Sequence, residues 1–181
     1  MQTSITEFYN NNPVLLYAGD FTLADILAQS DIWLEKQHDF IQLLFPLPEV
    51  SIHNKEAPTL TPQIIEQIIN SPLYQSKIML ALIRMLKFYK LNINNGKVER
   101  SFDFNTRYYC YSHGHNHLRL TRIIRCLYLC GLTYWSNSLY DILLEIQKEH
   151  NIFSSATLNH FKAAVSGEKY EQPNTIIAKS V

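Results

Sequence analysis

Helix-start signals recur along the sequence in a way that only a helical chain needs. Thr61-Pro62 and Ser71-Pro72 each place a capping residue directly before a proline, the preferred pairing for the N-cap and the first position of a helix. Apolar residues then recur with helical periodicity, while alternating patterns bounded by tight hairpin turns hardly occur. The sequence therefore predicts an all-α fold.

Six or seven helices follow from these signals, arranged as an irregular bundle. Thr22 and Asp25 have the spacing of a capping box, Pro46 forbids continuation of the second helix, and Gly131 is placed to end the fifth. Either Ser136 or Asn137 is expected to cap the sixth. The expected ranges are 23–29, 31–45, 63–69, 73–90, 118–130, 136–150 and 155–165.

The helix expected at 73–90 is apolar on nearly every side, which predicts a central, buried position. Asn94-Asn95-Gly96 is expected to end the helical segment, and 97–112 reads as an irregular connection with one helical turn. A chain of 181 residues, 46% of them hydrophobic, suits one domain with a sizeable core. We expect that domain at 1–167 and a flexible tail at 168–181.

Charge and cysteine content narrow the functional classes. Sixteen basic residues balance sixteen acidic ones, so no overall field favours nucleic acid as a partner. No apolar run reaches the roughly 18 residues of a membrane span, and the first residues lack a secretory signal pattern. Three cysteines without a CxxC pair indicate reduced thiols and a cytoplasmic location. Peripheral membrane association and oligomeric state stay open.

Three histidines at alternate positions, His113, His115 and His117, raise the possibility of a metal-dependent hydrolase. Alternate side chains share one side of an extended segment, and Asp103 and His38 are candidate further ligands. The competing interpretation, which we favour, is a polar loop before a helix. The sequence has no Ser-His-Asp order, glycine-rich phosphate loop or close carboxylate pair. We therefore assign no catalytic residue and no cofactor, and favour a non-enzymatic role.

Arginines recur every three residues in the following helix. Arg119, Arg122 and Arg125 form a basic strip, and Asn116 or His115 is expected at the N-terminus, where Asn is a good cap. Such an arrangement suits a carboxylate or a phosphate, and nucleic acid is the alternative ligand. The interpretation that we favour is structural, with the arginines pairing with acidic residues of neighbouring helices. Cys126 and Cys130, four apart on the same face, indicate core packing.

Two separated runs resemble one family. HDFIQLLFPL at 38–47 and HNHLRLTRI at 115–123 are similar to the most characteristic runs of the conserved N-terminal domain of opioid growth factor receptors. APTLT at 57–61 and MLKFYKL at 85–91 resemble further family segments in the same order. The resemblance covers roughly 8–165, and several ordered matches are far more specific than one. Leu43 replaces the family's tryptophan, and Lys90 stands where a glycine is common.

The resemblance implies an all-α domain that acts as a binding module. Animal members of the family are described as binding the pentapeptide met-enkephalin and as acting in growth control at or near the nucleus. By resemblance, a peptide or another ligand with an anionic end is the expected partner.

His38 and Gln42 are one turn apart on a helix that otherwise reads as buried, so both need polar partners. The Asn116, Arg119 and Arg122 group is the candidate, which predicts that the two motif segments meet. The resulting network is either architectural or lines a ligand pocket. The predicted ligand-binding residues are His38, Gln42, His115, Asn116, Arg119 and Arg122.

Overall fold

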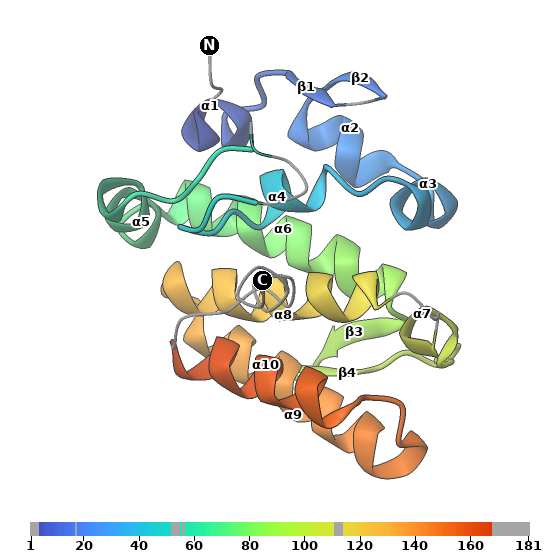
Figure 1. The fold of residues 1–181 in the computed structure, drawn as a ribbon. Helices are drawn as coiled ribbons and strands as arrows, with labels where there is room; N and C mark the ends of the chain where they lie inside the picture. The colour runs from blue at the N-terminus through green and yellow to red at the C-terminus, as the bar shows by residue number, and fades with distance from the viewer. Residues whose placement is uncertain (1–3, 17, 52–54, 56, 111–113, 168–181) are drawn as a thin grey trace, which may run out of the picture.

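The computed structural model describes residues 4–16, 18–51, 55, 57–110 and 114–167, so the expected tail at 168–181 lies outside the described residues. The described chain forms two tiers (Figure 1). One tier holds α1 (Ile5–Tyr9), β1 (Val14–Leu16), β2 (Gly19–Phe21), α2 (Leu23–Ala28), α3 (Asp31–Lys36), α4 (Ile41–Leu44), α5 (Pro62–Ile69) and α6 (Pro72–Phe88). The other holds β3 (Leu91–Asn94), β4 (Lys97–Arg100), α7 (Arg107–Cys110), α8 (His115–Leu129), α9 (Thr133–His150) and α10 (Ser155–Ser166).

Local caps begin the helices where the sequence predicts. Thr22 Oγ1 accepts the amide of Asp25, whose carboxylate accepts the amide of Thr22 at 2.9 Å, so the capping box of α2 is confirmed. Thr61 caps α5 and Ser71 caps α6, each followed by proline at the first position. Ser154 caps α10, where its hydroxyl oxygen accepts the amide of Thr157. The predicted caps are confirmed. Each one depends mainly on residues within a single helical turn, so a short sequence pattern is enough to locate it.

Helix α6 of one tier and helix α8 of the other contact each other where the tiers meet, and they run antiparallel. Gln75 near the start of α6 donates to the carbonyl of Cys130 at the end of α8 (3.3 Å). Tyr89, which directly follows α6, donates to the carbonyl of Asn116 in the first turn of α8 (3.4 Å). One cluster of buried hydrophobic residues extends from Ile5 in α1 to Ala164 in α10. Both tiers therefore share one continuous core.

The all-α prediction is correct for most of the fold but misses two antiparallel hairpins. β1 pairs with β2, and β3 pairs with β4 so that Asn94 lies opposite Lys97. Asn95 and Gly96 have positive φ values of 49° and 75°, as a tight two-residue hairpin turn requires. The expected role of this Asn-Gly pair as a helix end was therefore wrong. Part of the irregular 97–112 connection is a strand, and its one helical turn is α7.

The residue that follows the C-cap of α6 has a left-handed backbone conformation. Lys90 has φ of 58°, a left-handed conformation that favours glycine, at the position where the opioid growth factor receptor pattern has glycine. Its carbonyl accepts the amide of Ser101 at 3.1 Å, which holds the start of the hairpin against its end. The substitution therefore leaves the turn in place and adds a cation to it.

The helix expected at 31–45 is interrupted between α3 and α4. Gln37 ends α3 in an extended conformation, with φ −84° and ψ 140°. In an unbroken helix its carbonyl would accept an amide one turn later, but here it accepts Arg119 of α8. A tertiary hydrogen bond from a charged donor thus replaces the helical hydrogen bond of the Gln37 carbonyl. No residue within 31–45 indicates this replacement.

Two residues expected as helix N-caps lie inside helices instead. α8 begins at His115, one of the two expected positions, with Gly114 in the cap position, so Asn116 is inside the first turn and is not the N-cap. α9 begins at Thr133, and Ser136 lies buried within it. The Ser136 hydroxyl donates to the carbonyl of Ile124 at 2.9 Å, which joins α9 to α8. Both residues thus make tertiary contacts in place of the predicted caps.

Helix α6 is central in position but is not buried on every side, which corrects the sequence-based expectation. Ile78, Leu82 and Met85 are fully buried, whereas Leu80 and Ile83 are about half exposed. Within the described part of the chain, no helix is both long enough and apolar enough to cross a membrane.

Candidate functional site

Two histidines meet where the first motif segment contacts α8. We call this contact the motif junction; it is formed by residues 35–45 and the first three turns of α8. His38 lies in the bend between α3 and α4, and His115 is the first residue of α8. Their ring centroids are 5.0 Å apart, with ring planes at 85°. His38 is exposed and the His115 side chain is 27% exposed, so both reach solvent.

Arg119 forms the buried centre of the motif junction. Its guanidinium donates to the carbonyl of Gln37 and to Asn116 Oδ1 (3.1 Å), and Nη2 lies 3.3 Å from His38 Nδ1. The guanidinium carbon lies 5.2 Å from the centroid of the Phe40 ring, a cation–π distance. Burial lowers the pKa of Arg119, but an arginine remains charged in proteins. The junction therefore surrounds a permanent buried cation.

Asn116 connects three elements. Its amide nitrogen donates to Glu35 Oε2 in α3 at 3.0 Å, and its Oδ1 accepts from both Arg119 and the Tyr89 hydroxyl (3.3 Å). Asn116 and Arg119 are each only 3% exposed. The side chain of Asn116 is thus bonded to residues on α3, on α8 and at the end of α6. That placement indicates a structural role, since buried amides require partners.

Glu35 provides the negative charge beside this cation. Its Oε1 lies 3.1 Å from His115 Nε2, and both side chains are about one quarter exposed. Burial is the main cause of a lowered pKa at His115; the positive charges of Arg119 and His38 lower it further, and Glu35 opposes them. At neutral pH the His115 imidazole is therefore uncharged, and it gains its charge only on acidification.

Gln42 and Arg122 also belong to the junction but bond to different atoms. Arg122 Nη1 donates to the carbonyl of Phe45 at 3.1 Å. In the amide orientation that satisfies both ends, Gln42 donates to the carbonyls of His38 (3.1 Å) and Asp39 (2.8 Å). The structure therefore places His38 and Arg119 in contact as expected, while Gln42 stabilises the bend that carries His38.

The arginine strip predicted on α8 lies largely against the protein interior. Arg125 is buried and its Nη2 lies 2.8 Å from Glu49 Oε1, and Arg119 is buried as described. Two of the three arginines are thus covered by the segment that follows α3. The sequence predicts acidic partners for this strip on neighbouring helices, but it does not indicate Glu49, Phe40 or Tyr89, which lie far from α8 along the chain.

The match to protein families covers nearly the whole chain. The model of the opioid growth factor receptor conserved region matches residues 3–177. The chain belongs to this opioid growth factor receptor family. It is 33% identical to the mouse opioid growth factor receptor over 168 residues, 87% of this chain and 26% of that protein. The human receptor is 32% identical over 168 residues, covering 87% and 24%.

A second group of relatives matches a shorter segment. The rat opioid growth factor receptor-like protein 1 is 33% identical over 114 residues, 61% of this chain and 24% of that protein. The chain thus spans about a quarter of the length of the receptors that it matches. No solved structure gives a significant match.

The histidine stretch of this family member does not place its described histidines side by side. His115 points to Glu35 and His38, whereas His117 Nε2 lies 2.7 Å from the carbonyl of Tyr109 and its ring packs on Phe153. The two residues are on a helix, so the shared side of an extended segment is lost. His113 lies outside the described residues. Within the described ranges, no three His, Cys, Asp or Glu side chains form a group that could hold a metal.

Cys126 and Cys130 lie on the core side of α8. Both are fully buried and their sulfur atoms are 4.0 Å apart. Burial raises the pKa of the Cys126 thiol well above its usual range, because the low-polarity surroundings disfavour a thiolate. Core packing therefore accounts for their position.

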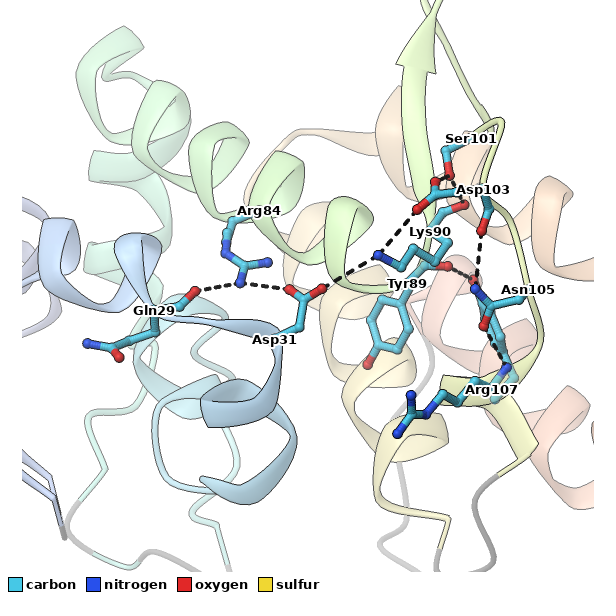
Figure 2. Close-up of polar contacts among 10 residues, drawn as sticks. Gln29, Asp31, Arg84, Tyr89, Lys90, Ser101, Asp103, Asn105 and Arg107 are labelled. Atoms are coloured by element: carbon cyan, nitrogen blue, oxygen red, sulfur yellow. Dashed lines mark hydrogen bonds and ion pairs between the residues drawn. The ribbon is translucent and has the colours of Figure 1, made fainter.

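A second polar network of this opioid growth factor receptor-family domain links α3, α6 and the β3–β4 hairpin (Figure 2). Arg84 donates to the carbonyl of Gln29 (2.6 Å) and to Asp31 Oδ1 (2.9 Å). Lys90 then lies between two carboxylates, 3.7 Å from Asp31 and 3.4 Å from Asp103. The network fixes the hairpin against the N-terminal tier.

Proposed function

We propose that this domain is a non-enzymatic interaction module that binds a peptide, or another ligand with an anionic end, at the exposed edge of the motif junction. The observation that supports the proposal best is the pairing of two solvent-reaching imidazoles over the buried cation of Arg119. A carboxylate at this edge would be attracted by the positive charge of Arg119 and would compete with Glu35, which already lies beside that cation. The names of the relatives as receptors agree with a binding role.

The predicted site residues divide into two roles under this proposal. His38 and His115 contact the ligand, because their rings reach solvent. Asn116 and Arg119 supply charge and hold the two rings in position from within. Gln42 and Arg122 position the 38–45 segment through its backbone carbonyls, and they contact the ligand less directly.

Isothermal titration of met-enkephalin, whose carboxy terminus is the anionic end, tests the proposal against the same pentapeptide with an amidated carboxy terminus. We expect the free acid to bind more tightly, by about tenfold if one charge-assisted hydrogen bond is lost in the amide. His38→Ala and His115→Ala should each weaken binding of the free acid. Arg122→Ala should weaken it less, through displacement of the 38–45 segment.

His150→Ala is the matched control, since His150 is an exposed histidine in the last turn of α9. Its binding should equal that of the wild type. Equal affinity for acid and amide, or unchanged binding in both junction histidine variants, would overturn the assigned site.

The alternatives have less support. A nucleic-acid role would use the Arg119, Arg122 and Arg125 strip, but two of these arginines face the protein interior. A metal-dependent hydrolase would use His113, His115 and His117, and metal analysis of purified protein tests it directly. Stoichiometric Zn²⁺ that is lost from the triple alanine variant would favour that enzyme over the interaction module.

A further inference from the structure

Helix α6 leaves one apolar face uncovered by the described part of the chain. Leu73, Leu80 and Ile83 are 54%, 48% and 51% exposed. At 100° per residue the three side chains fall within a sector of about 80°, so they form one stripe along the helix. We call Leu73, Leu80 and Ile83 the α6 stripe. With Lys87 one turn further on, this face extends over about 21 Å at 1.5 Å per residue.

A groove continues the stripe at the carboxyl end of α6. It has a volume of about 610 Å³ and lies between the last turns of α6, strand β3 and the turn after β4. Phe102 at its rim is fully exposed. The wall residues are mainly apolar and include Ile83, Leu86, Lys87, Leu91, Ile93 and Phe102. Stripe and groove share Ile83, so they form one continuous surface.

The charges on this surface have one dominant sign. No residue of α6 is acidic, and its basic residues are Lys77, Arg84 and Lys87. Arg84 is already paired with Asp31, and Lys90 at the groove is held by Asp31 and Asp103. Lys77 and Lys87 form no ion pair with any residue that the structure describes, and they flank Leu80 and Ile83 at a spacing of three or four residues. A positive charge without an ion-pair partner among the described residues therefore lies on each side of Leu80 and Ile83, with Lys77 between Leu73 and Leu80 and Lys87 beyond Ile83.

We propose that the α6 stripe and its groove dock an amphipathic helix of another protein, with acidic residues flanking its apolar face. The face of α6 from Leu73 to Lys87 accommodates about four turns of a partner helix, and the groove accommodates one larger side chain at the end of that helix. Glu or Asp on the partner would meet Lys77 and Lys87. The proposal concerns a different surface from the motif junction and does not depend on the ligand proposed there.

Two other occupants fit the surface less well. A second copy of this chain packed antiparallel would bring Lys77 of one copy near Lys87 of the other, which is a like-charge pair. A membrane surface favours a convex apolar face with basic residues, whereas this surface is concave at one end. An acidic helix avoids the first conflict, and its side chains fill the concave end.

The probe is a synthetic helix of about 18 residues, roughly 27 Å long, with leucines on one face and flanking glutamates. A second peptide replaces every glutamate with lysine. Titration of the full chain should show binding of the acidic peptide and at least about tenfold weaker binding of the basic one, the loss expected when attraction becomes repulsion. Affinity for the acidic peptide should fall with added salt.

Two double variants test the surface itself. Leu80→Ser with Ile83→Ser removes the stripe, and Lys77→Glu with Lys87→Glu reverses its charge; each should weaken the acidic peptide by about tenfold or more. Leu144→Ser with Lys148→Glu on α9 changes an exposed leucine and an exposed lysine elsewhere, and its affinity should equal that of the wild type. Because all six side chains are at least partly exposed, thermal unfolding should confirm that every variant folds.

Four results would overturn the proposal. Equal binding of both peptides, or unchanged binding in both stripe variants, removes the surface as a helix-docking site. A dimer seen by sedimentation and lost on Leu80→Ser with Ile83→Ser identifies a second copy as the occupant. Tighter binding to phosphatidylserine vesicles than to the acidic peptide, lost on Lys77→Glu with Lys87→Glu, identifies a lipid surface.

Discussion

Arg119 Nη2 of α8 lies 3.3 Å from His38 Nδ1, which joins two residues 81 positions apart and brings the two motif segments into contact. The same guanidinium donates to the carbonyl of Gln37 and so holds the chain at the break between α3 and α4. One side chain therefore positions the bend and the imidazole that the bend carries.

Replacing this cation should destabilise the fold strongly. Arg119→Met keeps most of the apolar volume but leaves the Gln37 carbonyl and Asn116 without a charged donor. We expect a loss of about 3 kcal/mol in the free energy of unfolding, as for other buried charged networks. Urea unfolding measures it. Lys148→Met on the exposed face of α9 is the control, with a change within about 0.5 kcal/mol. Equal effects would contradict a central role for Arg119.

The Tyr89 hydroxyl should contribute to the same junction. Tyr89→Phe removes the donor to Asn116 within the core, at an expected cost of about 1 kcal/mol. Tyr134, which is exposed and donates to the carbonyl of Gly96, provides the comparison. Tyr134→Phe should cost less than about 0.5 kcal/mol, because water replaces the lost partner. Chemical unfolding of both variants tests whether burial sets the difference.

Mild acid should destabilise the protein through two histidines. Burial lowers the pKa of both His115 and His117 from 6.5, so the unfolded chain binds more protons than the folded one as pH falls. Stability is thus highest above pH about 6.5 and falls below it. Urea midpoints between about pH 7.5 and 5 should decline, and less steeply in a His115→Gln, His117→Gln variant. A midpoint that rises on acidification would contradict the assigned shifts.

Lys90 separates a backbone effect from an ionic one. Both Lys90→Ala and Lys90→Gly remove the contacts to Asp31 and Asp103, but only glycine relieves the strain of φ 58°. We expect the glycine variant to be more stable than the alanine variant by about 1 kcal/mol. Thermal unfolding of the pair measures this difference. A more stable alanine variant would mean that the left-handed backbone is not strained.

The sequence predicts those features that depend on neighbouring residues. The caps Thr22, Thr61 and Ser71 are found where expected because each satisfies amides of its own first turn. The contact between the motif segments was also predictable, since buried polar groups on one require partners on another. The individual pairs of atoms were not predictable. Gln42 bonds to carbonyls of its own bend, and Asn116 bonds to Glu35 and Tyr89.

The errors arise where tertiary contacts outweigh local preference. Gln37 leaves its helix because its carbonyl accepts a hydrogen bond from the distant Arg119, and no signal within 31–45 indicates that donor. The β3–β4 hairpin, by contrast, has a local signal, because Asn95-Gly96 is a common pair in two-residue hairpin turns. The error was to interpret this pair as a helix end. The sequence does not predict which face of α6 is exposed. Apolar residues occur on most sides of this helix, so they do not indicate which side its neighbours cover.

The fully buried Cys126 and Cys130 provide a built-in reporter of how often the two tiers part. A thiol reagent reaches these sulfur atoms only after α8 has separated from its packing neighbours, so their rate of alkylation measures transient opening of the core. Mass spectrometry of the modified peptides, followed over time in the wild type and in Arg119→Met, would give the frequency of that opening under native conditions.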